Sequence, residues 1–363
     1  MDFWWSLSDR LQSSPRFRAI AGAFPPSRPI ARRRARAVFD LTAGFVYSQV
    51  LLACVQLDLP RILLQGAATT DALAIRLALS PAAATRLLNA AASLRIARRR
   101  RGGRFGLGRA GAALIDNPGV TAMIAHHRLL YDDLRDPVAL LRGESGPTRL
   151  ARHWPYAANA APPDAAEAAA YSALMGASQA MVAEQALAAY DVRRHRVLLD
   201  VGGGDGSFLV AAGRRAAGLR LVLFDLPAVA ALAQARFARD GLSARATVQA
   251  GNFCHDPLPA GADLISLVRV LHDHEDETVR GLLRAARAAL APGGTLLVIE
   301  PMAETPGAQA MGDAYFGFYL LAMGSGTPRS ARRLQAMLRA AGFSKSRLLA
   351  TRLPLVTQMI AAS

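Results

Sequence analysis

Residues 197–207 read VLLDVGGGDGS, a short apolar run followed by a glycine-rich turn. An apolar run of this length predicts a buried strand, and the apolar periodicity after the turn predicts a helix. The glycines at the turn, Gly202, Gly203, Gly204 and Gly206, let a ligand approach the main chain closely. The start of the next helix adds N–H groups that lack helical partners. The stretch therefore predicts a strand–turn–helix unit that binds a ligand at its turn.

The alternation of strands and helices continues from this turn along the chain. Apolar runs at 197–201, 219–224, 246–249, 264–271 and 295–299 predict strands, and the segments 207–217, 228–240 and 277–290 predict helices. A further helix is expected at 330–341 and a strand at 347–353. Such alternation indicates a parallel sheet with helices on both faces. We therefore expect an α/β domain, a doubly wound Rossmann-like sheet, over residues 191–363.

The spacing around the glycine turn indicates which ligand it binds. A dinucleotide fingerprint would need glycine where the chain has Ser207, and the Gly-Lys-Ser/Thr of a P-loop is absent. Asp200, just before the turn, suits a ligand that carries an ammonium group. Asp225 ends the next predicted strand and can accept hydrogen bonds from both ribose hydroxyls. Together these features indicate S-adenosylmethionine; a tight turn with a helix-capping acid is the structural alternative.

The amino-terminal half has a different organisation. Residues 1–36 are expected to form an arm, aromatic at Phe3, Trp4 and Trp5 and rich in arginine near residues 32–36. Residues 37–190 are expected to form a helical domain. Helices at 71–79 and 81–94, followed by two strand-like pieces around a Gly-Gly turn at 102–103, outline a winged helix.

Motifs in the second half resemble a known family. The stretches Asp200-Val-Gly-Gly-Gly-Asp-Gly, Phe224-Asp225-Leu-Pro, Gly251-Asn252-Phe253, Arg269-Val-Leu-His272-Asp273 and Pro292-Gly-Gly occur in the order seen in S-adenosylmethionine-dependent O-methyltransferases of the plant caffeate/hydroxyindole type. The resemblance covers nearly the whole chain. It implies an enzyme that binds S-adenosylmethionine and forms a homodimer through its winged-helix domain.

Other stretches resemble a branch of this family, the bacterial hydroxyneurosporene (demethylspheroidene) O-methyltransferases of carotenoid biosynthesis. They are the segments 39–49, 126–131, 154–156 and 313–319. The implied acceptor is a hydrophobic hydroxylated small molecule, a 1-hydroxy carotenoid. A phenolic or polyketide acceptor is the alternative.

The resemblance also implies roles for individual residues. His272 corresponds to the general base and Glu300 to the acid that orients it, with Asp273 as a further catalytic residue. The expected cofactor-binding residues are Asp200, Gly202, Gly203, Gly204, Gly206, Asp225, Leu226, Asn252, Phe253 and Arg269. The apolar and aromatic run at 313–324 predicts an acceptor pocket, with ordinary core packing as the alternative. The expected pocket residues are His127, Tyr131, Met175, Met302, Phe316, Tyr319 and Met323. We expect no metal, because the acids and histidines at 272–276 fit a strand end and a solvated helix start better than a ligand set.

The chain departs from the family pattern at two positions. Asn252 stands where the family usually has an acid beside the adenine; its amide carbonyl can still accept a hydrogen bond from the adenine amino group. A second glutamate flanking the base would fall near Ala331 and is missing. Glu300 or Asp273 would then hold the imidazole alone. A lapsed methyltransferase that serves as a scaffold is a further alternative, disfavoured by the retained His272 and Glu300.

Charge is unevenly distributed along the chain. The formal net charge is +16, from 43 Lys+Arg and 27 Asp+Glu, and residues 1–109 hold 18 Arg against 5 acids. A basic winged helix raises the alternative of a DNA-binding regulator, but the complete cofactor site favours an enzyme without a nucleic-acid partner. The basic half suits an anionic bilayer that holds a water-insoluble substrate, with solvated arginine faces as the plain alternative. Two cysteines, no signal peptide and no long uninterrupted apolar run predict a cytoplasmic protein. The placement of charge adds the hypothesis that it is peripheral at the inner membrane.

Overall fold

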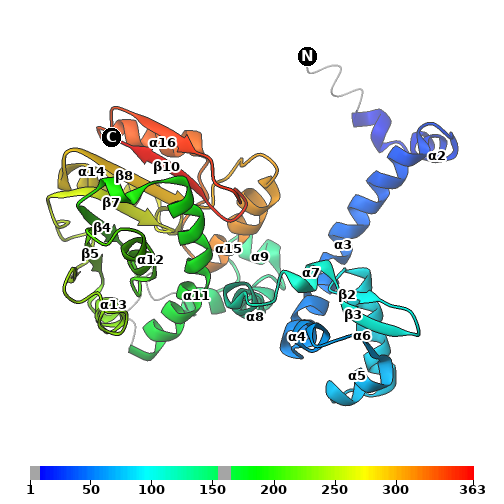
Figure 1. Ribbon diagram of the computed structural model, residues 1–363. Coiled ribbons are helices and arrows are strands. Elements are labelled where there is room, and N and C mark those ends of the chain that lie inside the picture. The colour runs from blue at the N-terminus through cyan, green and yellow to red at the C-terminus, as the bar shows by residue number, and fades with distance from the viewer. Residues whose placement is uncertain (1–8, 154–164) are drawn as a thin grey trace. The chain divides into compact units, whose positions relative to one another are not determined.

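The computed structural model describes residues 9–153 and 165–363 (Figure 1). The expectations for Phe3, Trp4, Trp5 and residues 154–156 lie outside these residues. The chain divides into two compact units, Met1–Ile115 and Asp116–Ser363. The sequence analysis placed breaks after residues 36 and 190 instead, and those bounds stay predictions. Helix α3 (Arg28–Gln56) continues through residue 36, because Pro29 starts it and an arginine- and alanine-rich stretch sustains it.

The first unit contains the winged helix that the sequence predicts. Its helices are α2 (Pro15–Ala23), α3, α4 (Leu59–Leu64), α5 (Thr70–Arg76), α6 (Pro81–Ser93) and α7 (Arg109–Ala112). Strands β1 (Ala68–Thr69), β2 (Ala97–Arg99) and β3 (Arg104–Leu107) form a small sheet in the order β1-β3-β2. Helix α6 begins where Ser80 accepts a hydrogen bond from the Ala83 N–H and Pro81 occupies the first turn.

The second unit is built on one seven-stranded sheet. The strands are β4 (Val197–Val201), β5 (Arg220–Asp225), β6 (Ala246–Ala250), β7 (Ala262–Val268), β8 (Leu290–Glu300), β9 (Ser346–Leu349) and β10 (Gln358–Ala362). Their order is β6-β5-β4-β7-β8-β10-β9, with β4 to β8 parallel and β10 antiparallel to both of its neighbours. The doubly wound fold is therefore confirmed.

Helices cover both faces of this sheet. Those that contact its strands are α12 (Ser207–Arg215), α13 (Pro227–Arg239), α14 (Asp276–Ala289) and α16 (Ala331–Ala340). The other helices of the unit are α8 (Pro118–Asp133), α9 (Pro137–Leu141), α10 (Arg149–His153), α11 (Ala165–Ala189) and α15 (Phe316–Met323), with the short segments η1 (Val192–Arg194), η2 (Leu271–Asp273) and η3 (Ala310–Tyr315). Residues 116–190 belong to this unit because α11 packs against α12 and α13.

The chain order reverses beside β4, which has β5 on one side and β7 on the other. Doubly wound sheets bind ligands at the carboxyl ends of the strands at such a reversal. Asp225 ends β5 and Glu300 ends β8 at this edge, and the glycine turn follows β4. The fold thus brings the predicted residues to one edge of the sheet.

Three strands differ from the sequence expectation, and one of them is β9, which ends at Leu349 where a strand to residue 353 was expected. Strand β7 ends at Val268, three residues early, because Arg269 adopts a left-handed conformation with φ of 57°. Strand β10 was not predicted, although all five of its residues are buried. Its sequence, QMIAA, is short and only partly β-branched, so the pattern gave a weak strand signal.

Candidate active site

The glycine turn is shaped by contacts that exclude side chains. A Cβ on Gly203 would lie 2.6 Å from Oδ2 of Asp200, and one on Gly206 would lie 2.6 Å from the Phe237 ring. Gly202, Gly204 and Gly206 also have positive φ angles. A Cβ on Gly204, in contrast, would meet nothing within 4 Å. Gly204 is therefore the glycine of this turn that faces open space, where a ligand can approach.

Asp200 is fully buried at the end of β4, and one of its oxygens has no partner. Oδ1 accepts a hydrogen bond from the Ser266 hydroxyl at 2.5 Å, while Oδ2 lacks a protein donor. Burial raises the pKa of this carboxyl to about 7. An unpartnered buried oxygen is costly, so this acid is suited to a donor that the ligand supplies. Ser266, on β7, was missed because one serine inside an apolar strand carries no sequence signal.

Asp225 accepts two backbone hydrogen bonds at the start of α13. Oδ2 accepts from the Gly204 N–H at 2.8 Å, and Oδ1 accepts from the Leu226 N–H at 2.7 Å. These bonds tie the acid to the glycine turn. Desolvation by burial outweighs them and raises the pKa of the carboxyl to about 6. Free lone pairs remain on both oxygens, as binding to a pair of ribose hydroxyls requires.

Asn252 and Phe253 follow β6 at the same edge of the sheet. Oδ1 of the Asn252 side chain accepts a hydrogen bond from the Cys254 N–H at 2.9 Å, and this bond fixes the side-chain amide. The carbonyl keeps a second lone pair for a ligand. Phe253 packs edge-on against His274, with ring centroids 5.2 Å apart. Both residues are partly buried, so each keeps surface for contact with a ligand.

Arg269 connects the end of β7 to helix α11. Its backbone N–H donates to the Ile299 carbonyl at 2.8 Å, and its Nη1 donates to the Ser178 hydroxyl at 2.7 Å. Ser178 is buried on α11 and was not singled out from the sequence. The guanidinium is thereby fixed beside the carboxyl ends of β7 and β8.

His272 lies in η2, buried between two carboxylates. Its Nε2 is 3.1 Å from Oδ1 of Asp273, and its Nδ1 is 3.5 Å from Oε2 of Glu300. The backbone N–H of His272 donates to the same Glu300 oxygen at 3.2 Å. The structure thus brings the three predicted catalytic residues together, with an acid beside each ring nitrogen.

The two acids control the protonation of His272. Burial on its own would lower the pKa of the imidazole, but Asp273 and then Glu300 stabilise the charged ring and raise the pKa to about 9. The imidazole is therefore mostly protonated at neutral pH. Only its neutral form can accept a proton, so the site becomes a better base as pH rises.

An aromatic cluster begins beside His272 and extends to α8. The centroids of the His272 and Phe316 rings are 5.8 Å apart, and Phe316 packs against Tyr315 at 4.9 Å. Tyr315 also stacks on Tyr319 at 5.8 Å. Helix α15 follows η3 without a break, so these rings all lie on one continuous helical segment.

Two histidines of α8 hydrogen-bond this cluster. Nε2 of His127 lies 2.7 Å from the Tyr315 hydroxyl, and Nε2 of His126 lies 3.0 Å from the Tyr319 hydroxyl. Nδ1 of His127 lies 2.6 Å from the Met123 carbonyl, so this nitrogen carries the proton and Nε2 accepts from Tyr315. Burial lowers the pKa of His127. Tyr131 lies beside His127, with centroids 6.4 Å apart.

The three methionines of the predicted pocket do not all lie beside the aromatic cluster. Met323 is buried with Tyr319 in a core cluster that includes Leu130 and Leu150. Met302 is fully buried in the core under the sheet, so we leave it out of the proposed acceptor site. Met175 lies in α11, but its side chain is outside the described residues.

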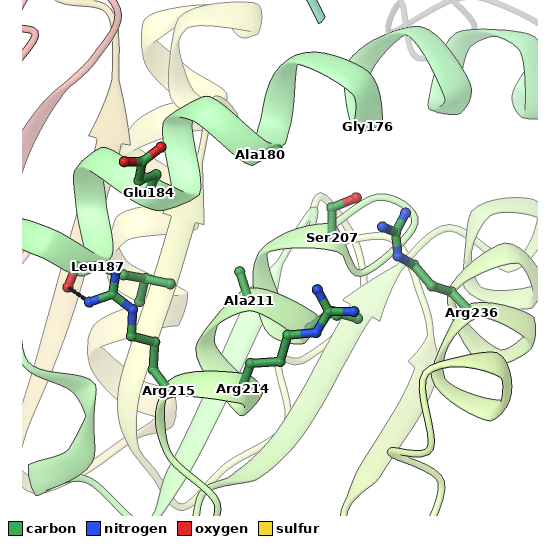
Figure 2. Close-up of a pocket in the computed structure, with 10 residues that line it drawn as sticks. Gly176, Ala180, Glu184, Leu187, Ser207, Ala211, Arg214, Arg215 and Arg236 are labelled. Atoms are coloured by element: carbon green, nitrogen blue, oxygen red, sulfur yellow. Dashed lines mark hydrogen bonds between the residues drawn. The ribbon is translucent and has the colours of Figure 1, made fainter. Parts of the chain in front are cut away.

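A separate pocket of about 380 Å³ lies between α11 and α12, lined by three arginines (Figure 2). Arg214 is paired with Asp240, Arg236 with Asp205, and Arg215 donates to the Leu187 carbonyl. Two of the three arginines are therefore paired with a carboxylate, and the third bonds a backbone carbonyl. Within the described residues, no group of three or more His, Cys, Asp or Glu side chains could hold a metal ion.

Comparisons with known proteins identify the fold and the chemistry. Residues 131–344 match the family model described as the O-methyltransferase domain. The chain belongs to the O-methyltransferase family. Residues 39–117 of this O-methyltransferase match the family's dimerisation domain, which supports a homodimer.

The enzyme is similar to named relatives along its whole length. It is 45% identical to the demethylspheroidene O-methyltransferase of Cereibacter sphaeroides over 98% of this chain and 94% of the relative. It is 42% identical to that of Rhodobacter capsulatus, over 97% of this chain and 88% of the relative. Among solved structures, CalO1, a methyltransferase in calicheamicin biosynthesis, in its SAH-bound form, is 26% identical to this chain with a TM-score of 0.77. The match covers 91% of this chain and 98% of that one.

The enzyme is an S-adenosylmethionine-dependent O-methyltransferase, and its residues fit that cofactor. The unpartnered Asp200 oxygen suits an ammonium donor, Asp225 suits a ribose, and Gly204 faces open space. The individual residue roles remain predictions. Ala331, where the family pattern has a glutamate, is partly buried against the core, so Asp273 and Glu300 flank His272 without a third acid from that position.

Proposed function

We propose that this enzyme methylates a hydroxyl of a 1-hydroxy carotenoid, with His272 as the general base. The observation that carries the proposal is the aromatic cluster of Tyr315, Phe316 and Tyr319, which begins beside His272. A polyene needs an extended apolar and aromatic surface next to the reacting group. The identity of 45% to a demethylspheroidene O-methyltransferase supports the same acceptor class.

The proposed reaction is an in-line displacement that the protein assists by positioning and by removing one proton. S-Adenosylmethionine supplies a methyl group activated by its sulfonium. Asp200, Gly204 and Asp225 would hold the cofactor, and Asn252 and Phe253 would border its base. The neutral form of His272 would take the acceptor proton, and Asp273 and Glu300 would stabilise the imidazolium that results.

The chemistry of an aliphatic hydroxyl limits how this proton moves. An alcohol with a pKa near that of water, about 16, holds its proton far more tightly than an imidazolium of pKa about 9. Full deprotonation before transfer would cost about 10 kcal/mol. The proton therefore leaves together with methyl transfer, as the developing charge on the oxygen is removed by the new bond.

An acceptor screen tests the proposal. Purified enzyme with labelled S-adenosylmethionine should convert a hydroxy-carotenoid in detergent to its methyl ether and should leave simple phenols almost unmethylated. His272→Ala should lower turnover by 10²-fold or more. Preferential methylation of phenols would contradict the acceptor assignment, and unchanged turnover by the variant would contradict the base assignment.

We also propose that the enzyme associates peripherally with an anionic bilayer through α2 and the start of α3. Phe17, Ile20 and Phe24 are 40%, 66% and 57% exposed. The spacing of Phe17 and Ile20 places them on one side of α2, and Phe24 is the C-cap residue of that helix. Exposed arginines accompany them at Arg16, Arg18, Arg32 and Arg33. These residues precede the match to the dimerisation domain, which begins at residue 39. An apolar helical face with a basic surround suits a membrane surface.

Helix α3 also has exposed apolar residues, but we do not assign them to lipid contact. By length and composition it is the helix, among the described residues, that could cross a membrane, whereas the sequence analysis predicted no such segment. Its exposed residues Phe39, Leu41 and Phe45 fall within the dimerisation-domain match. Burial against a second subunit accounts for these residues, so the proposed lipid contact is confined to the region before them.

Vesicle sedimentation tests the membrane proposal. Replacing Arg16, Arg18, Arg32 and Arg33 with serine should reduce binding to vesicles that contain anionic lipid, by roughly tenfold or more at low salt. The matched control replaces four exposed arginines of the second unit, Arg332, Arg339, Arg347 and Arg352, and should bind like the wild type. Equal binding of the wild type to neutral and anionic vesicles would contradict the proposal.

A further inference from the structure

The backbone of the catalytic loop is held by a segment distant in sequence. Four consecutive carbonyls, those of Leu271, His272, Asp273 and His274, each accept a hydrogen bond from the segment 325–329. The Thr327 N–H donates to the His272 carbonyl at 2.9 Å, and the Ser325 hydroxyl donates to the Asp273 carbonyl at 3.0 Å. The orientation of the His272 ring therefore depends on this segment.

Arg329 makes two of these four contacts. Its Nη1 donates to the Leu271 carbonyl at 2.8 Å and its Nη2 to the His274 carbonyl at 2.7 Å, so one guanidinium spans the loop on both sides of His272 and Asp273. The residue is 3% exposed. A planar guanidinium presents its donors in a fixed geometry, and an ammonium group cannot reproduce both contacts.

Asp276 fixes the other edge of the guanidinium. Its Oδ1 accepts from Nε of Arg329 at 2.8 Å, and its Oδ2 accepts from Arg333 at 2.7 Å. The buried cation is thus paired, and its free rotation is removed. Arg329 is anchored in turn by its own carbonyl, which accepts from the Ala303 N–H three residues after Glu300. The same residue therefore links the loop of His272 to the end of the strand that carries Glu300.

The segment also approaches the loop closely at Gly326. A Cβ on Gly326 would lie 2.2 Å from the His272 carbonyl oxygen, and the residue has φ of 90°. Its N–H donates to the Glu275 carboxylate at 3.1 Å. The contacts of Arg329 are therefore part of a continuous close packing between residues 325–329 and 271–275.

We propose that Arg329 is a positioning residue for methyl transfer, which holds the His272–Asp273 loop so that the imidazole stays between Asp273 and Glu300. The residue touches neither acceptor nor cofactor in this role and acts through the loop backbone. The inference rests on the proposed base function of His272. Small displacements of a reacting group lower turnover strongly, so loss of the guanidinium should affect kcat more than binding.

The test compares Arg329→Met with a matched arginine elsewhere in the same unit. Arg245 donates to three backbone carbonyls, those of Gly213, Ala216 and Leu219, away from the catalytic loop. Arg329→Met should lower kcat by roughly 10- to 100-fold, leave the Kd for S-adenosylmethionine within about twofold, and move the pH at which kcat rises. Arg329→Lys should recover part of kcat. Arg245→Met should reduce thermal stability and leave the pH profile of kcat unchanged.

Other variants keep the test decisive. If Arg329→Met does not fold, Asp276→Asn loosens the same guanidinium and should produce a smaller change of the same kind. A loss of stability in the Arg329 and Asp276 variants, with kcat per folded molecule and the pH profile unchanged, would overturn the inference. His272→Ala in the same series separates the two proposals. If it stays active, the proposed base function fails; if it is inactive while Arg329→Met is fully active, only the positioning role fails.

Discussion

Nε2 of His272 lies 3.1 Å from Oδ1 of Asp273, the next residue in the chain. With Glu300 beside the other ring nitrogen, the imidazole is a buried cation between two anions. The neutral ring would leave two buried carboxylates without a counter-charge. The geometry therefore favours the protonated ring until pH rises.

The first prediction concerns the pH dependence of turnover. The pKa of His272 is raised to about 9, so the neutral, proton-accepting form increases as pH rises through that value. We expect kcat to rise from pH 7 to a plateau above about 9. In Asp273→Asn, which removes the largest stabiliser of the cation, the rise should move to lower pH. Steady-state kcat between pH 6.5 and 10 checks this, and a profile that falls above pH 7 would count against it.

The second prediction concerns stability. A histidine whose folded pKa is raised from 6.5 to about 9 contributes stability that is fully present below about 6.5 and is lost as pH rises through about 9. The shift corresponds to about 3 kcal/mol. Urea unfolding of wild type and His272→Gln at pH 6 and pH 9.5 should show a difference that shrinks at the higher pH. A constant difference would exclude this linkage.

The third prediction concerns Asp200. Burial raises the pKa of its carboxyl to about 7, so ionisation above that pH destabilises the folded protein, and the effect is absent below the ordinary value of 3.8. Asp200→Asn should therefore raise the Tm of the cofactor-free protein at pH 8 and weaken S-adenosylmethionine binding about tenfold or more. Calorimetry and equilibrium binding measure the two effects. A lower Tm together with unchanged affinity would contradict both assignments.

The fourth prediction separates two glycines of one turn. Gly206→Ala would place a methyl group 2.6 Å from the Phe237 ring at φ of 78°, and should destabilise the fold by about 2 kcal/mol or more. Gly204→Ala meets nothing within 4 Å and should cost about 1 kcal/mol from its positive φ alone. When only folded molecules are compared, Gly204→Ala should nevertheless weaken cofactor binding more than Gly206→Ala does. The reverse order of affinities would place the ligand elsewhere.

Much of the site could be predicted because its parts are local in sequence. The glycine turn follows its strand directly, so the spacing of Asp200, Gly204 and Ser207 was enough to predict the class of ligand. Asp225 could be placed because parallel strands end at the same edge of the sheet. His272 and its neighbours came from the family resemblance, and the structure then supplied their distances.

The remaining features depend on contacts between distant segments. Arg329 is one arginine among many, and its contacts with residues 271–274 join positions 55 or more apart in the chain. Ser266 bonds Asp200 from another strand, which no local pattern reveals. The helix of residues 28–56 runs through the break predicted after residue 36, because the change of composition there does not interrupt it. Composition alone does not end a helix.

Strand β10 covers the free side of β8, the strand that carries Glu300. It is the last of the seven strands along the chain, yet it pairs with β8 on one side and β9 on the other. Its first residue, Gln358, is the register partner of Glu300. Within the sheet, β9 pairs with β10 alone. Weakening the pairing of β10 should therefore loosen the end of the strand that carries the acid beside His272, so such a variant should lose activity before the β4–β5–β7 centre of the sheet unfolds.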